Sequence, residues 1–164
     1  MDIKLLSKDY QDDLRNLVKT TIQNLQNPEW LIALTDIEID NIFDNNQVIL
    51  YGAIENDVLL SISGLFFDKS DFLDIVKLLG IENKKVAEIA ECMTFPEYRG
   101  NNYMLKINQV LLKKAKELGI EYLIATAHPD NIASNTSLSK LGMKCSGQIQ
   151  RYGKFLRNYY VIKI

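Results

Sequence analysis

The sequence predicts an α/β fold of the α+β sandwich kind, in which a mixed central sheet is flanked by helices. Its 164 residues are 47% hydrophobic and 24% charged, which suits one folded domain with a sizeable core. Short β-rich runs alternate with helical patterns along the chain. Residues 86–127 combine a buried strand, a helix and a second buried strand, which is typical of a βαβ unit with a parallel pair. We therefore expect a single domain over residues 1–164.

The N-terminal part of the chain is predicted to contain one short strand and two helices. Residues 3–7 form a strand candidate, and Asp9 then opens a pattern whose apolar residues recur on one helical face. Residues 35–44 indicate a second, shorter helix. Thr35 is its predicted N-cap, and Glu38 three residues later completes a capping box.

The middle of the chain gives the clearest hairpin signal. Two β-rich runs, 47–54 and 58–67, flank the pair Asn56-Asp57, which suits a tight turn. Residues 70–80 then favour a helix that Ser70 caps and a glycine ends. The elements predicted for the second half are a strand over 85–95, a helix that ends at Gly119, a strand over 121–127, a helix that ends at Gly142, and strands near 143–150 and 155–163.

Composition excludes several classes of function. The net charge is −2, from 19 basic and 21 acidic residues, so we expect no nucleic-acid partner. The N-terminus lacks the apolar core of a signal peptide and no segment has the length of a membrane span, so we expect a cytoplasmic protein without a membrane partner. With His128 as the single histidine, we expect no metal site. Cys92 and Cys145 both fall in apolar strand-like runs, which argues against a disulfide framework.

Residues 95–104, "FPEYRGNNYM", join the predicted central strand to a long helix. Unpaired N–H groups and a partial positive charge make such a helix start a site for anions. Arg99 adds a fork of donors suited to phosphate oxygens, and Gly100 permits close approach of the backbone. Asn101 and Asn102 stand where further permissive residues are needed, and we predict that Asn102 adopts a left-handed or helix-entry conformation. A plain surface turn is the alternative.

Two motifs resemble those of the GCN5-related N-acetyltransferase (GNAT) family. The family's acyl-CoA loop follows V-x-P-x-[YF]-[RQ]-G-x-G-x-[GA]. It is matched or closely approached by Thr94, Pro96, Tyr98, Arg99 and Gly100, whereas Asn102 and Met104 depart from it. The later helix pattern, N-x-x-[AS]-x-x-x-[YL]-x-x-x-G-[FM], is met by Asn131, Ser134, Leu138, Gly142 and Met143. The predicted order of elements also agrees with this family from end to end.

The resemblance implies acetyl-CoA as co-substrate and donor, with an amine as acceptor and no metal. It implies that the loop holds the pyrophosphate, and that the preceding strand bonds the pantetheine arm and offers an N–H to the thioester oxygen. Asn131 would bond the same arm from the neighbouring helix. The residues that the resemblance places against acetyl-CoA are Cys92, Met93, Thr94, Arg99, Gly100, Asn101, Asn102, Tyr103, Met104, Asn131 and Ser134.

Two carboxylates in the central strand are candidates for the general base. Strand alternation places Glu88 on the face of Cys92 and Thr94, and Glu91 on the opposite face. The histone-acetyltransferase branch of the family has a strand A-E-I-x-x-C-x-V with a catalytic glutamate, which "AEIAECMT" matches at Glu88. We therefore predict that Glu88 is the base and that Glu91 points away. The alternative is that an arginine or lysine pairs with either carboxylate in a structural role.

The remaining roles stay open at this point. Leu138 stands where many relatives have a tyrosine that protonates the departing thiolate, so Tyr103 or solvent would take over that role. Cys92 is either a small buried residue or a nucleophile, and the first is more common. Trp30 is a candidate for the acceptor wall or for core packing.

Two hypotheses about function follow from these patterns. The first is an N-acetyltransferase in which the amine attacks the thioester directly. The second is a catalytically degenerate domain that binds CoA or a partner without turnover. Neither the acceptor, whether amino acid, polyamine or peptide N-terminus, nor the oligomeric state, a homodimer included, follows from the sequence.

Overall fold

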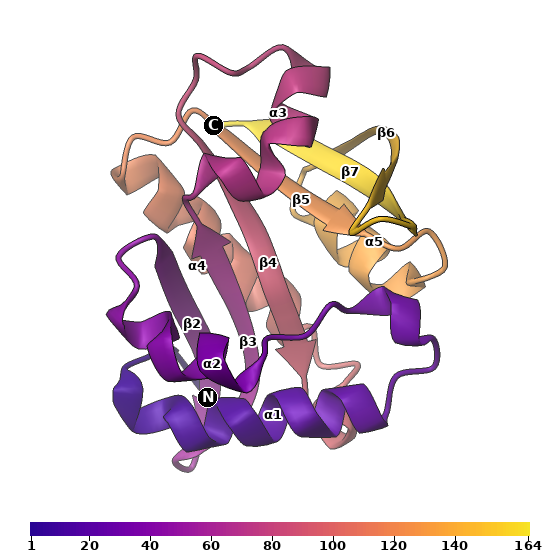
Figure 1. Ribbon diagram of the computed structural model, residues 1–164. Coiled ribbons are helices and arrows are strands. Elements are labelled where there is room, and N and C mark those ends of the chain that lie inside the picture. The colour runs from indigo at the N-terminus through magenta and orange to yellow at the C-terminus, as the bar shows by residue number, and fades with distance from the viewer.

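Seven strands form one sheet in the order β1-β2-β3-β4-β5-β7-β6 in the computed structural model, which describes residues 1–164 (Figure 1). All neighbouring strands are antiparallel except β4 and β5, which are parallel as predicted. The strands are β1 (Asp2–Leu5), β2 (Val48–Glu55), β3 (Val58–Phe66), β4 (Val86–Thr94), β5 (Tyr122–Ala127), β6 (Lys144–Arg151) and β7 (Phe155–Lys163).

Helices cover both faces of the sheet. They are α1 (Gln11–Gln23), α2 (Asp36–Asn41), α3 (Leu73–Leu79), α4 (Tyr103–Glu117) and α5 (Ile132–Lys140). Figure 1 shows α1, α2 and α3 on one face, with α4 on the other. None of these helices combines the length and the apolar character that a membrane crossing requires.

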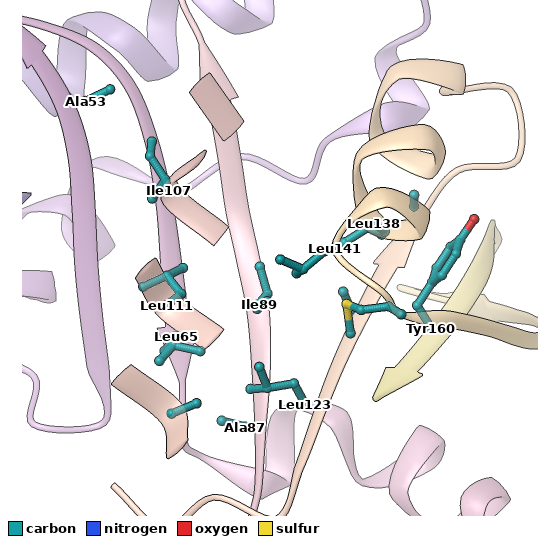
Figure 2. Packing of buried hydrophobic residues seen from close by; sticks show 14 residues of the cluster. Ala53, Leu65, Ala87, Ile89, Ile107, Leu111, Leu123, Leu138, Leu141 and Tyr160 are labelled. Atoms are coloured by element: carbon teal, nitrogen blue, oxygen red, sulfur yellow. The ribbon is translucent and has the colours of Figure 1, made fainter. Parts of the chain in front are cut away.

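The largest part of the core lies between the sheet and the helices α4 and α5. Ile107 and Leu111 of α4 are fully buried there, and Leu138 and Leu141 of α5 complete the same cluster. Figure 2 shows Ile89 of β4 between these two helical groups. Each such side chain contributes about 1.5–3 kcal/mol by leaving water. The core therefore fixes both helices that follow β4 and β5 against the same face of the sheet.

Several predictions of local structure are confirmed. Each concerns a cap or a turn whose conformation depends on a few neighbouring residues. Thr35 Oγ1 accepts from the backbone N–H of Glu38 at 3.3 Å, and the Glu38 carboxylate accepts from the N–H of Thr35 at 2.7 Å. The hairpin turn places Asn56 and Asp57 at φ of 50° and 63°, as a type I′ turn requires. Gly80 ends α3 in the left-handed conformation.

One local prediction is wrong. Asp68, not Ser70, caps the turn before α3, since its carboxylate accepts from the N–H of Ser70 at 3.0 Å. A short 3-10 turn over Lys69–Phe72 therefore precedes α3. Both cysteines are free, and Cys145 is exposed on β6.

Strand β4 contains a bulge that the period-2 pattern does not reveal. Ala90 pairs with Gly64 and Met93 with Ile62, so two residues of β4 lie opposite Ser63 alone. Glu91 has a φ of 54°, the left-handed conformation of a bulge residue. Before the bulge, even-numbered side chains lie on the α3 face, where Val86 packs. After it, Cys92 packs on the α4 side and Met93 on the α1 side.

The faces predicted for the two glutamates are therefore wrong. Glu88 lies on the face opposite Cys92, because the bulge at Glu91 inverts the alternation between them. Glu91 does not point away from the site, since it lines the same pocket as Glu88.

The parallel strands β4 and β5 separate beyond their fourth pair. Their ladder runs from Val86–Tyr122 to Ile89–Ala125, while β4 continues to Thr94. Figure 1 shows the two strands diverging toward their carboxyl ends. Residues 90–94 consequently have no strand partner on the β5 side, so their backbone groups on that side are free for a ligand.

Candidate active site

Two cavities meet where β4 and β5 diverge. The larger one, which we call the donor cleft, has a volume of about 610 Å³ and runs along the 98–105 loop and the start of α5. The smaller one, which we call the acceptor pocket, has a volume of about 140 Å³ and lies between β4, β7 and the segment around Trp30. Their walls share Thr21, Leu25, Trp30, Cys92, Met104, Asn131 and Ser134.

The loop before α4 forms an anion cradle. Gly100 has a φ of 83° with open space around its Cα, and Asn102 has a φ of 58°, so its predicted left-handed conformation is confirmed. The Asn102 side chain makes no capping hydrogen bond, which leaves the first N–H groups of α4 without a side-chain partner. Asn101 donates through Nδ2 to the carbonyl of Tyr98 at 3.0 Å and thereby holds the turn. This geometry suits an anion at the start of α4.

Arg99 is exposed at the rim of the donor cleft and forms no ion pair. A free guanidinium next to an uncapped helix start concentrates positive charge there. All eleven residues predicted to bind acetyl-CoA line this cleft, although they come from β4, the loop, α4 and α5. Asn131 also caps α5, because its Oδ1 accepts from the N–H of Ser134 at 3.1 Å.

Glu88 is buried and paired. Its Oε1 accepts from Nη1 of Arg151 at 3.0 Å, and Arg151 also donates to the carbonyl of Asp71 at 2.7 Å. The Nε of Arg151 lies 3.5 Å from a carboxylate oxygen of Asp74. Burial raises the pKa of Glu88, and the charge of Arg151 opposes that rise. The structural pairing that the sequence left open as an alternative is therefore present at Glu88.

Glu91 is in the opposite situation. Its Oε2 is buried in the acceptor pocket and has no hydrogen-bond partner. Burial raises the pKa of Glu91 to about 8, and the charges of Glu38 and Glu88 add to the rise. An unpaired buried carboxyl group of this kind is costly, which makes it a mark of a functional site.

Cys92 lies at the junction of the two cavities, beside the bulge. Burial raises the pKa of its thiol to about 11. The thiol is therefore neutral near pH 7, and a neutral thiol is a poor nucleophile.

The walls of the acceptor pocket contain two more unpaired polar groups. Nε1 of Trp30 and Oγ1 of Thr21 are buried without partners, and both residues line both cavities. Trp30 lines both cavities, and its role as an acceptor wall stays a prediction. Leu138 lines the pocket too, but it is part of the core. Tyr103 lines the donor cleft only.

The β6–β7 hairpin supplies site residues that the sequence analysis missed. Arg157 of β7 is 4% exposed and lines the acceptor pocket, as does Tyr152 of the turn. Arg157 alternates in phase with Tyr159 and Val161, which pack in the core on the α3 side. A charged residue at a strand position whose neighbours in the alternation are apolar is unusual, and this pattern could have identified Arg157 from the sequence.

Comparison with known proteins gives one family. The model of the acetyltransferase (GNAT) domain matches residues 20–144 of the chain. No curated protein matches the sequence significantly.

Solved structures resemble the whole chain in fold. An N-acetyltransferase from Staphylococcus aureus Mu50 has a TM-score of 0.76 at 18% identity, over 99% of this chain and 96% of that one. The ribosomal-protein-alanine N-acetyltransferase from Brucella melitensis has a TM-score of 0.75 at 16% identity, over 100% of both chains. The yncA protein from Salmonella typhimurium, solved with its cofactor acetyl-CoA, has a TM-score of 0.75 at 15% identity, over 99% of this chain and 93% of that one. The seven-stranded mixed sheet with helices on both faces is thus the fold of these proteins.

Proposed function

This chain belongs to the GNAT family of acetyltransferases, and we propose that it transfers the acetyl group of acetyl-CoA to a primary amine of a small molecule or a peptide. The observation that carries the proposal is the meeting of two cavities at Cys92. A long cleft ends at an anion cradle, and a smaller pocket contains an unpaired carboxyl group. A transfer between two substrates needs such a meeting point, because the reacting atoms must approach to about 3–3.5 Å.

The walls of the donor cleft fit acetyl-CoA chemically. The uncapped start of α4 and Arg99 suit a pyrophosphate, while Gly100 and Asn102 leave room for close approach. The free backbone edge of 90–94 suits the amides of the pantetheine arm, and one of its N–H groups would polarise the thioester oxygen. When bound, acetyl-CoA supplies an acetyl group activated toward amines.

The acceptor amine must lose a proton before it attacks. The sequence predicts Glu88 as the base, and that role stays a prediction, but the ion pair with Arg151 weakens it. We propose Glu91 instead, because its free oxygen lies in the acceptor pocket and next to Cys92. A lysine-type ammonium has a pKa of about 10.4, so proton transfer to a group at about 8 is uphill by about 3 kcal/mol. An ordinary glutamate would face about 8 kcal/mol.

The protonated thiol of Cys92 favours direct attack of the amine on the thioester over a route through an acetylated cysteine. A thiol with a pKa of about 11 does not supply the thiolate that an acetyl-cysteine route needs. On becoming an amide, the ammonium loses two protons. One passes to Glu91 and is released to solvent, and the other balances the thiolate that leaves as CoA thiol. We propose that Tyr103 or solvent protonates this thiolate.

The test is product formation with purified protein, acetyl-CoA and a panel of amino acids, polyamines and peptide N-termini. Mass spectrometry of the acetylated product is the suitable readout, because exposed Cys145 would react with thiol reagents. We expect one class of amine to be acetylated, and a Glu91→Gln variant to lose that product while it still binds acetyl-CoA.

A degenerate CoA-binding domain is the second candidate, favoured by Leu138 at the position where many relatives have a tyrosine. It predicts thermal stabilisation by acetyl-CoA without an acetylated product from any amine. The orphan carboxyl group of Glu91 speaks against it, since a domain without turnover gains nothing from a buried unpaired acid.

A further inference from the structure

Arg157 is a buried cation without a carboxylate partner. It is 4% exposed, and no acidic group lies within 4.0 Å of its nitrogens. Two of its N–H groups donate to backbone carbonyls, those of Glu29 at 2.6 Å and of Leu156 at 2.9 Å. A guanidinium has five N–H donors, so three have no protein acceptor. Burying a cation under these conditions costs free energy unless an anion joins it.

The surroundings of Arg157 do not supply a full counter-charge. Burial lowers the pKa of Arg157 and Arg151 nearby lowers it further, whereas Tyr152 raises it. The carboxylate of Glu29 also raises the pKa of Arg157, but it lies 3.5 Å from Nε2 of His128 and is about half exposed. The rings of Tyr152 and Phe155 lie 5.9 and 5.7 Å from the guanidinium carbon. Aromatic rings stabilise a guanidinium, but they do not neutralise its charge.

Arg151 gives the internal comparison. It belongs to the same hairpin and is equally buried, at 5% exposed, yet it has both Glu88 and Asp74 as partners. Arg151 therefore has carboxylate partners within the fold, whereas Arg157 has none and lines the acceptor pocket. Glu91 in the same pocket has an unpaired oxygen. The pocket thus contains one buried cation without an anionic partner and one carboxyl group with an unpaired oxygen.

We propose that the acceptor is a small amine that also carries a carboxylate, such as an amino acid, and that Arg157 binds this carboxylate. This inference rests on the proposed function and names its substrate class. A planar guanidinium suits a carboxylate, since two parallel N–H groups can reach both oxygens. Glu91 would then face the ammonium group of the same molecule. The pocket volume of about 140 Å³ suits a small molecule of this kind.

The experiment compares L-amino acids with their own C-terminal amides as acceptors, at fixed acetyl-CoA, by mass spectrometry of the products. The amide keeps the shape and removes the charge. We expect kcat/KM to be at least tenfold higher for the acid form. Arg157→Gln should remove this preference by raising KM for the acid, with the amide changed by less than twofold. Arg151→Gln is the matched control, and it should lower stability while the preference remains.

Binding gives a second readout that does not depend on turnover. Calorimetry with N-acetyl-amino acids and their amides, in the presence of CoA, should show tighter binding of the acid to the wild type and equal binding to Arg157→Gln. Equal rates and equal binding for acid and amide in the wild type, or a preference that survives Arg157→Gln, would overturn the inference and leave acetyl transfer intact. Acid-dependent binding without any acetylated product would overturn the proposed function but support the carboxylate site.

Discussion

Arg151 holds Glu88 by a buried 3.0 Å hydrogen bond between the β6 end of the sheet and β4. The two residues are 63 positions apart in the chain. Arg151 pairs with Glu88, whereas Glu91, the other glutamate of β4, has an oxygen without a hydrogen-bond partner. The bulge at Glu91 then decides where that oxygen lies, since it places the residue in the acceptor pocket instead of on a regular strand face.

Glutamine at each of the two positions distinguishes their roles. Glu91→Gln removes the base and should lower kcat by about 10²–10⁴-fold, with acetyl-CoA affinity nearly unchanged. The loss should shrink at high pH, where the amine deprotonates without help. Glu88→Gln should instead lower the free energy of unfolding by roughly 1–3 kcal/mol, because Arg151 loses a charged partner but keeps Asp74. Steady-state kinetics and chemical denaturation measure the two effects.

A wild-type rate in Glu91→Gln, together with an inactive but folded Glu88→Gln, would restore Glu88 as the base. In that case the ion pair with Arg151 would have to open during turnover.

The pH dependence of stability reports the state of Glu91 directly. Its pKa is 4.5 when it is unperturbed and about 8 in the fold. Between these values the unfolded chain ionises while the folded protein keeps the proton, so stability falls as pH rises. The slope approaches about 1.4 kcal/mol per pH unit, with an upper bound of about 5 kcal/mol over the window. We expect denaturation curves of wild type and Glu91→Gln to diverge in this way between pH 4.5 and 8. If the stability of wild type and of Glu91→Gln depended on pH in the same way, the Glu91 carboxyl group would have an ordinary pKa and would be solvated.

Arg99→Ala tests the anion cradle. Loss of a charged hydrogen bond should weaken acetyl-CoA binding by roughly 1.5–3 kcal/mol, which isothermal titration calorimetry can measure. The effect should decrease with added salt, since Arg99 is exposed. Arg15→Ala is the control, because that arginine pairs with Asp36 and Asp40, and neither it nor these partners line the donor cleft. Affinity that is unchanged in Arg99→Ala would contradict the cradle.

Asn102 tests the backbone of the same loop. Its φ of 58° suits glycine at least as well, so Asn102→Gly should keep or improve acetyl-CoA affinity. Asn102→Val should lower both stability and affinity, because a β-branched residue is strained in this conformation. Thermal melts with and without acetyl-CoA compare the two variants. If they behave alike, the left-handed conformation has no part in binding.

Cys92→Ala tests direct attack. Because the thiol is neutral near pH 7, its removal should change kcat by only a few fold. Intact-protein mass spectrometry of the wild type with acetyl-CoA alone should show no acetyl group on Cys92. Loss of turnover in Cys92→Ala, together with an acetylated Cys92 in the wild type, would establish a two-step route instead.

Predictions from the sequence succeeded where a few neighbouring residues determine the structure. The capping box of Thr35 and Glu38, the turn at Asn56-Asp57 and the left-handed Asn102 each depend on local geometry. The residues predicted to bind acetyl-CoA line one cleft, and their contact with acetyl-CoA stays a prediction.

The errors have a different origin. No local pattern predicts a left-handed glutamate inside a strand. The prediction of regular alternation through Glu91 therefore missed the bulge. Arg151 and Arg157 come from a hairpin far from β4 in the chain, and only tertiary packing brings Arg151 to Glu88 and Arg157 to the pocket. The acceptor side of the site is built mainly from such long-range contacts, whereas the donor side is built mainly from one loop and two helix starts.

Ligands in the two cavities would contact the same seven wall residues. A ligand that orders Trp30 or Met104 in one cavity alters the surface that the other ligand meets. Linkage then imposes reciprocity: whatever factor acetyl-CoA applies to the affinity of the acceptor, the acceptor applies to the affinity of acetyl-CoA. An affinity measured with one ligand alone would differ by that same factor from the affinity in the presence of the other ligand.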